Sequence, residues 1–194
     1  MIDSDATVTT TPPQLTPLQQ AHQWIQQGRW QDAAHLCRQA LAGAPRDAAL
    51  HAMLGSALRG LGDAAGAEAA LRQSVALDPR LPAAWRTLAD LQFRRQDWAQ
   101  AEVSLASLNQ LLPDDAETWF ARGVVALKRD QAASAESWFA RALARDARLL
   151  DRRFALGQEA FRARDMTTAA IHYHACMQAR PDWVRSEERR VGKE

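Results

Sequence analysis

Short apolar patterns of helical period recur along this chain at one fixed interval. Around each of them, apolar residues stand three and four positions apart, which is the spacing of one face of an α-helix. The patterns are marked by evenly spaced alanines, at Ala33, Ala67, Ala101, Ala135 and Ala169. At the same interval come Pro45, Pro79, Pro113 and Pro181, with Ala147 in the remaining slot. A fixed period of about 34 residues predicts stacked helical units.

The period divides the chain into five blocks, at residues 14–47, 48–81, 82–115, 116–149 and 150–183. Each block predicts two antiparallel helices joined by a tight turn, with Gly ending one helix or Asp capping the next. The predicted turns are Gly28-Arg29, Gly62-Asp63, Gln96-Asp97, Asp130-Gln131 and Arg164-Asp165. The first helix is expected to begin after Thr16, because Thr16, Pro17 and Gln19 have the spacing of a capping box with proline at the first helical position.

The two ends lack this pattern. Residues 1–13 are polar and rich in Thr and Pro, which predicts a disordered leader. Residues 184–194 are expected to be a non-native or disordered tail, because the whole stretch 185–194 agrees with a translated sequencing adaptor. We therefore expect a fragment of a longer protein. A natural charged tail is the alternative.

The blocks resemble the tetratricopeptide repeat, a unit of about 34 residues with a leading Trp, small residues at fixed positions and a late Pro. Block 82–115 matches through Trp85, Leu88, Ala101, Leu105 and Pro113, and block 116–149 through Trp119, Gly123, Ala135, Phe139 and Ala142. In block 14–47 the leading Trp slot holds Pro17. The resemblance implies an all-α fold, a right-handed superhelical solenoid of antiparallel helix pairs.

Small and large residues alternate in this pattern for reasons of packing. Gly55, Gly123 and Gly157 are expected to let the paired helix approach closely. The large residues are expected to fill the space between one unit and the next. They are Leu71, Leu105, Phe139 and Tyr173.

The composition of the chain disfavours some classes of partner. The chain has 24 basic and 23 acidic residues, so its net charge is +1, which gives no electrostatic case for a nucleic-acid partner. Arginine supplies every base except Lys128 and Lys193, which suggests a bacterial source. Without a signal peptide or a long apolar run, we expect a cytoplasmic protein and no membrane partner. Cys37 and Cys176 lack metal-site spacing and are predicted to be reduced core thiols.

Motifs for chemistry are not found in the sequence, so we predict no enzyme activity, no catalytic residue and no cofactor. His172 and Cys176 stand four apart, as metal ligands on a helix can. Because Cys176 falls in the buried slot of Ala142 and no second ligand pair is evident, we predict no metal site and an exposed pair, His172 and His174.

In this family the first helix of each unit lines a concave groove. Transferring its groove-facing slots to this chain gives a surface in which Phe alternates with Arg, suited to a peptide with apolar anchors and acidic groups. Packing between first helices is the alternative explanation for these Phe residues. The slots are Leu18, His22, Ile25, Ala52, Ser56, Arg59, Arg86, Asp90, Phe93, Arg94, Phe120, Val124, Leu127, Lys128, Phe154, Gln158, Phe161 and Arg162.

The sequence therefore predicts an interaction scaffold that binds a protein or peptide. One alternative is the repeat region of a truncated bacterial enzyme, of the sulfotransferase or O-linked glycosyltransferase type, which genomic sequence beyond Val184 would reveal. Another is self-association through the uncapped fifth block.

Overall fold

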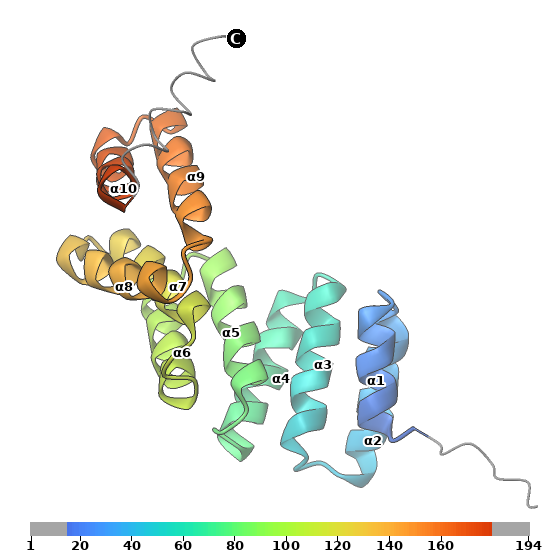
Figure 1. Cartoon of the computed structure of the whole chain (residues 1–194). Helices are drawn as coiled ribbons and strands as arrows, with labels where there is room; N and C mark the ends of the chain where they lie inside the picture. Colours follow the sequence, from blue (N-terminus) through green and yellow to red (C-terminus); the bar gives the residue numbers. More distant parts are fainter. Residues whose placement is uncertain (1–14, 180–194) are drawn as a thin grey trace, which may run out of the picture. The chain divides into compact units, whose positions relative to one another are not determined.

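A computed structural model describes residues 15–179, and these residues form ten α-helices and no strand (Figure 1). The expected leader at 1–13 and tail at 184–194 lie outside them. The helices are α1 (Pro17–Gln26), α2 (Trp30–Gly43), α3 (Ala48–Gly60), α4 (Ala64–Leu77), α5 (Pro82–Arg94), α6 (Trp98–Leu111), α7 (Ala116–Lys128), α8 (Ala132–Arg145), α9 (Leu149–Arg162) and α10 (Met166–Ala179). The all-α class is confirmed.

The helices pack in two compact units, which we call unit 1 (the described residues up to Leu91) and unit 2 (the described residues from Gln92 on). The boundary falls within α5. In unit 1, α1 packs on α2, α2 on α3 and α3 on α4; in unit 2, α6 packs on α7, α7 on α8, α8 on α9 and α9 on α10. Packing between neighbours in sequence is the arrangement expected of a repeat protein. The division into five blocks stays a prediction.

The five predicted turns are confirmed, and they share one backbone conformation. In each, the first residue of the predicted dipeptide takes a positive φ in the left-handed region. The φ angles are 73° at Gly28, 81° at Gly62, 59° at Gln96, 59° at Asp130 and 61° at Arg164. Glycine adopts this conformation without steric cost, whereas the other three residues hold it against their intrinsic preference.

Polar side chains cap several of these helices as the sequence indicated. Thr16 Oγ1 accepts a hydrogen bond from the Gln19 backbone N–H, and Gln19 Oε1 accepts one from the Thr16 N–H, which completes the capping box. After the second turn, Asp63 Oδ1 accepts from the Gly66 N–H at 2.9 Å. Each cap satisfies an amide that the helix itself leaves without a partner.

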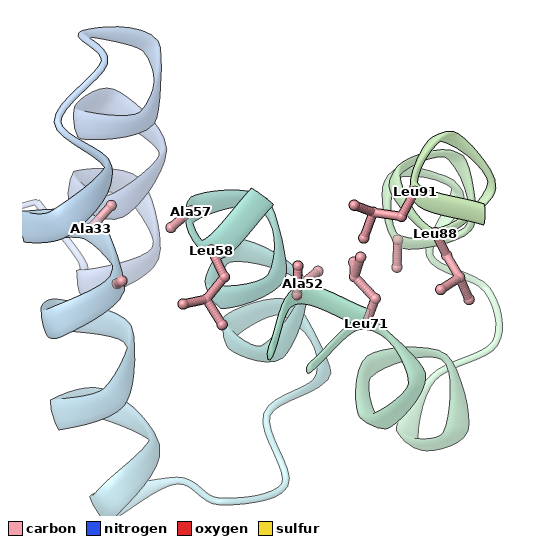
Figure 2. Packing of buried hydrophobic residues seen from close by; sticks show 10 residues of the cluster. Ala33, Ala52, Ala57, Leu58, Leu71, Leu88 and Leu91 are labelled. Carbon is pink, nitrogen blue, oxygen red and sulfur yellow. The ribbon is translucent and has the colours of Figure 1, made fainter. Parts of the chain in front are cut away.

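The core of unit 1 is made of small and branched aliphatic residues from four successive helices. Ala33 of α2 faces Ala57 and Leu58 of α3, while Leu71 of α4 lies toward Leu88 and Leu91 of α5 (Figure 2). Ala33, Ala57 and Leu71 are fully buried. The other marker alanines of the period are also buried, at Ala67, Ala101, Ala135 and Ala169.

Close approach at glycine occurs within a block and not only between blocks. A Cβ added to Gly55 would lie 2.5 Å from Leu71 Cγ, and one added to Gly123 would lie 2.7 Å from Phe139 Cε1. The predicted close contacts are therefore confirmed. The large residue of each pair also contacts the next block, as predicted: Leu71 lies toward Leu88 and Leu91 (Figure 2), and the Phe139 ring centroid lies 5.6 Å from that of His172.

Both cysteines are buried free thiols, as predicted. Cys37 and Cys176 are 0% exposed. Burial raises the pKa of each thiol to about 11, because desolvation disfavours the thiolate. At physiological pH neither side chain therefore has the ionised form that reactive cysteines need.

Candidate binding surface

Two of the groove residues predicted in unit 1 contact each other across neighbouring first helices. Arg59 at the end of α3 donates from Nη1 to Asp90 Oδ2 of α5 at 3.1 Å. Both side chains are more than a third exposed, so the ion pair lies at the surface and contributes little to stability. Arg86, one turn before Asp90 on α5, is exposed as well.

Unit 1 also has an apolar pocket of about 280 Å³ on its first helices. Three predicted groove residues contribute to it: Leu18 and His22 of α1 and Ala52 of α3. The remaining walls come from Gln19, Ala49, Met53, Leu81 and Ala83. The pocket offers room for apolar side chains and few polar partners.

The groove residues predicted in unit 2 divide into exposed, half-buried and buried sets. Phe161 is 56% exposed at the end of α9, and Arg94, Lys128 and Arg162 are exposed. Phe154 and Gln158 are half-buried. The centroids of the Phe154 and Tyr173 rings lie 5.3 Å apart.

Phe120 belongs to the buried set, since it is 2% exposed. Its ring lies edge-on to Phe139 with the centroids 5.1 Å apart. The guanidinium carbon of Arg152 lies 4.8 Å from the Phe120 centroid. Phe120 therefore packs in the core of unit 2 and does not reach an open surface. This agrees with the alternative in which the Phe residues serve in packing.

A larger pocket, of about 440 Å³, opens in unit 2 among the ends of α5, α7 and α9 and the start of α10. Four predicted groove residues line it, namely Phe93, Val124, Leu127 and Lys128. The sequence did not single out the other residues with large or polar side chains that line this pocket. They are Asp130 in the turn after α7, Leu156 and Glu159 on α9, Asp165 and Thr168 at the start of α10, and His172.

His172 is buried, which corrects the expectation of an exposed histidine pair. Its side chain is 2% exposed, and its Nδ1 has no hydrogen-bond partner among the described residues. Its ring lies edge-on to Phe139, with centroids 5.6 Å apart. Only His174 of the pair is exposed, and its Nε2 lies 2.9 Å from Gln178 Nε2. The period carried a signal for this burial, because position 172 corresponds to the buried Ser104.

Beside His172 lies a buried arginine that sequence reasoning also missed. Arg153 of α9 is 2% exposed, forms an ion pair with Glu136 of α8, and places its guanidinium carbon 4.5 Å from the Phe139 ring centroid. Its Nε has no partner among the described residues. Position 153 is the leading Trp slot of the repeat, one full period after Trp119, which explains why an arginine there is buried.

Burial and charge together keep His172 neutral at physiological pH. Desolvation, and after it the positive charge of Arg153, lowers the pKa of His172 to about 4 from an ordinary value of 6.5. Lys128 acts in the same direction, while Glu136 and Asp165 oppose the shift. Hydrogen bonds from Thr168 hold the pKa of Asp165 below its usual range.

This shift predicts that acid destabilises the fold through His172. A histidine whose folded pKa is depressed binds fewer protons in the folded than in the unfolded state, so stability is lost as pH falls below the unfolded pKa. From pH 7 to pH 5, we expect the free energy of unfolding to fall by about 2 kcal/mol through this residue. Urea unfolding at the two pH values measures it.

The matched variant is His172→Gln, which does not titrate in this range. Its unfolding free energy should change far less between pH 7 and pH 5 than that of the wild type. Equal losses in the two proteins would show that His172 does not carry the pH dependence. His174→Gln is the control, because His174 is exposed and its replacement should leave the loss unchanged.

Neither a metal centre nor a spanning helix is found in the part of the chain that the structure describes. Within residues 15–179, His, Cys, Asp and Glu do not gather in groups of three or more that could hold a metal ion. None of the helices in this range is long and apolar enough to cross a membrane. The predictions of no cofactor and of a cytoplasmic location are not tested by these findings.

Paired helices, turns that recur once in every period and packing between sequence neighbours define an α-helical repeat protein. A family model described as tetratricopeptide repeat matches residues 25–91 and again residues 58–121. The two matches together span residues 25–121, half of the chain. This protein therefore belongs to the tetratricopeptide repeat family.

Solved structures with the same fold include repeat proteins from three bacteria. MamA from Desulfovibrio magneticus RS-1 is 20% identical, with a TM-score of 0.67 over 81% of this chain and 89% of that one. PilF from Pseudomonas aeruginosa is 20% identical, with a TM-score of 0.65 over 84% of this chain and 74% of that one. A thermophilic TPR protein from Thermus thermophilus is 21% identical, with a TM-score of 0.57 over 91% of this chain and 96% of that one. At these identities the likeness establishes the fold alone. No match was found among curated proteins.

Proposed function

We propose that this protein is an interaction module that binds a protein or peptide partner along the first helices of its repeats. One observation carries the proposal. In each unit, first-helix residues that the family's groove slots single out line an open pocket, Leu18, His22 and Ala52 in unit 1 and Phe93, Val124, Leu127 and Lys128 in unit 2. Pockets of this size can hold the side chains of an extended or helical segment.

The exposed arginines support a partner that carries carboxylates between apolar anchors. Arg86 and Arg94 of α5 and Arg162 of α9 are exposed on first helices. A guanidinium pairs with a carboxylate through two parallel N–H donors, which gives orientation as well as attraction. The proposed ligand is therefore a peptide with both apolar and acidic residues.

Reversing these charges should weaken binding without unfolding the protein. The full chain, immobilised, is used to select binders from a displayed random peptide library, and the affinity of the enriched peptides is then measured. Because exposed ion pairs contribute roughly 0.2–1 kcal/mol each, the combined change of Arg86, Arg94 and Arg162 to Glu should lower the affinity by roughly three- to 150-fold.

The matched control reverses exposed arginines on second helices, Arg38→Glu on α2 and Arg145→Glu on α8, and should bind as the wild type does. Circular dichroism checks that both variants keep their helices. Failure to enrich any peptide would contradict the binding function itself. Affinity that is unchanged by the first set of reversals would remove this arginine surface from the proposal.

A further inference from the structure

The pocket of unit 2 has an acidic rim, although arginine is the commonest charged residue on the proposed binding helices. Asp130, Glu159 and Asp165 line it together with one cation, Lys128. The side-chain carboxylates of Asp130 and Glu159 form no hydrogen bond or ion pair with the other described residues. Two carboxylates are therefore available to a ligand.

In contrast to its charged rim, this pocket has apolar walls. Phe93 comes from the end of α5, Val124 and Leu127 from α7, and Leu156 from α9. Figure 1 shows α9 and α10 side by side. These apolar side chains suit a methylene stem, which can lie along hydrocarbon while a charged head stays at the polar end.

A polar group without a partner lies at the same pocket. His172 contributes to its lining, is 2% exposed, and leaves Nδ1 without a hydrogen bond among the described residues. Buried polar atoms are nearly always hydrogen-bonded in folded proteins. Because burial keeps His172 neutral at pH 7, one nitrogen of its ring is a hydrogen-bond acceptor, and a donor could reach Nδ1 only through a small shift of the side chains that cover it.

Apolar walls, an acidic rim and a buried acceptor favour one kind of occupant. An acidic side chain would meet three carboxylates, and a wholly apolar one would leave His172 and the rim without partners at a desolvation cost. A metal ion is disfavoured, because within residues 15–179 these carboxylates do not gather closely enough to ligate one. A side chain with a hydrocarbon stem and a head rich in N–H donors suits the apolar walls and the three carboxylates, which outnumber the single cation Lys128, and arginine does so better than lysine.

We propose that the unit 2 pocket binds an arginine or lysine side chain of the partner peptide, its stem against Leu127 and Leu156 and its head toward Asp130 and Glu159. The inference rests on the proposed function, since it names one residue of the same ligand. It adds a basic anchor to a peptide that is otherwise apolar and acidic.

The test uses the full chain and the peptides enriched from the random library. The decisive variant combines Asp130→Asn and Glu159→Gln, which removes two charges but keeps shape. Asn tolerates the left-handed conformation that Asp130 adopts, and Gln keeps the helical preference of Glu in α9. Asp151→Asn, an exposed acid in the first turn of α9 that does not line the pocket, is the control.

We expect the enriched peptides to share one basic residue, and its replacement by norleucine to weaken binding at least about tenfold, as loss of hydrogen bonds to charged groups does. The double variant should bind the original peptide more weakly by the same factor. Its affinity for the norleucine peptide should equal that of the wild type. The control should bind as the wild type does.

Enriched peptides without a basic residue, or affinities that the double variant leaves unchanged, would overturn the pocket assignment. If the same peptides still respond to the arginine reversals at Arg86, Arg94 and Arg162, the proposed function survives that failure. If no peptide is enriched, both proposals fail together.

Discussion

Replacing Phe139 with alanine is expected to lower the free energy of unfolding by about 3–5 kcal/mol. The ring is 0% exposed, and it has two aromatic neighbours, Phe120 at 5.1 Å and His172 at 5.6 Å between ring centroids. Gly123 lies so close that an added Cβ would stand 2.7 Å from it. Because the helices meet on this ring, its removal leaves a cavity that they cannot close without moving together.

Phe161→Ala is the matched control, because the Phe161 ring is 56% exposed in the same unit. The same deletion there should cost less than about 0.5 kcal/mol, as is usual for surface substitutions. Urea unfolding followed by both tryptophan fluorescence and circular dichroism measures the two variants. A loss below about 1 kcal/mol for Phe139→Ala would mean that unit 2 repacks around the missing ring.

The second large effect is expected when Glu136 is replaced by alanine. Glu136 is the ion-pair partner of Arg153, whose side chain is 2% exposed against 45% for Glu136. Removing the partner of a buried charge costs about 3–5 kcal/mol, and the partial exposure of Glu136 places the expected loss near the lower end. The Phe139 ring face gives the guanidinium a second contact, but a weaker one.

A double-mutant cycle with Arg153→Met separates this cause from others. Methionine fills much of the same volume without a charge, so Glu136→Ala in that background should cost less than about 1 kcal/mol. Glu117→Ala is the control, because its pair with Arg152 is about half exposed on both sides; its loss should stay within about 1 kcal/mol. Equal losses at Glu136 with and without Arg153 would show that the buried charge is not the cause.

The helices and turns could be predicted because their signals are local and repeat in phase. Thr16 and Gln19 lie within one turn of each other, and Gly62 and Asp63 are adjacent, so capping and turn preferences act there with little help from the rest of the chain. Repetition then carried the same pattern to Gln96 and Arg164, where the residue types alone would not have specified a left-handed turn.

The burial of Arg153 and His172 was not predictable from residue type. Arg153 and His172 look like surface residues by composition, yet each occupies a slot that holds Trp119 or Ser104 elsewhere in the period, and both those residues are buried. The position in the repeat therefore decides burial more strongly than the side chain does. The protein accommodates the charge with Glu136 and the Phe139 ring.

The candidate site was predicted in part for a similar reason. Phe93 and Lys128 lie on first helices, where the groove pattern of the family applies, and both line the pocket of unit 2. Asp130 and Asp165 come from the turns that precede second helices, which that pattern leaves out. Their approach to Glu159 depends on how α7, α9 and α10 pack, a tertiary property that no local signal records.

The five left-handed turns bear on how this sequence can change over generations. Most residues other than glycine pay about 1 kcal/mol or more in that conformation, Asn and Asp less than the others, and Gln96, Asp130 and Arg164 hold it already. At Gly28 and Gly62 a mutation would add such a cost. The early and late turns thus differ in the substitutions that they tolerate: glycine restricts substitution in the early turns, while in the later turns replacement by glycine would be the change that the backbone tolerates best.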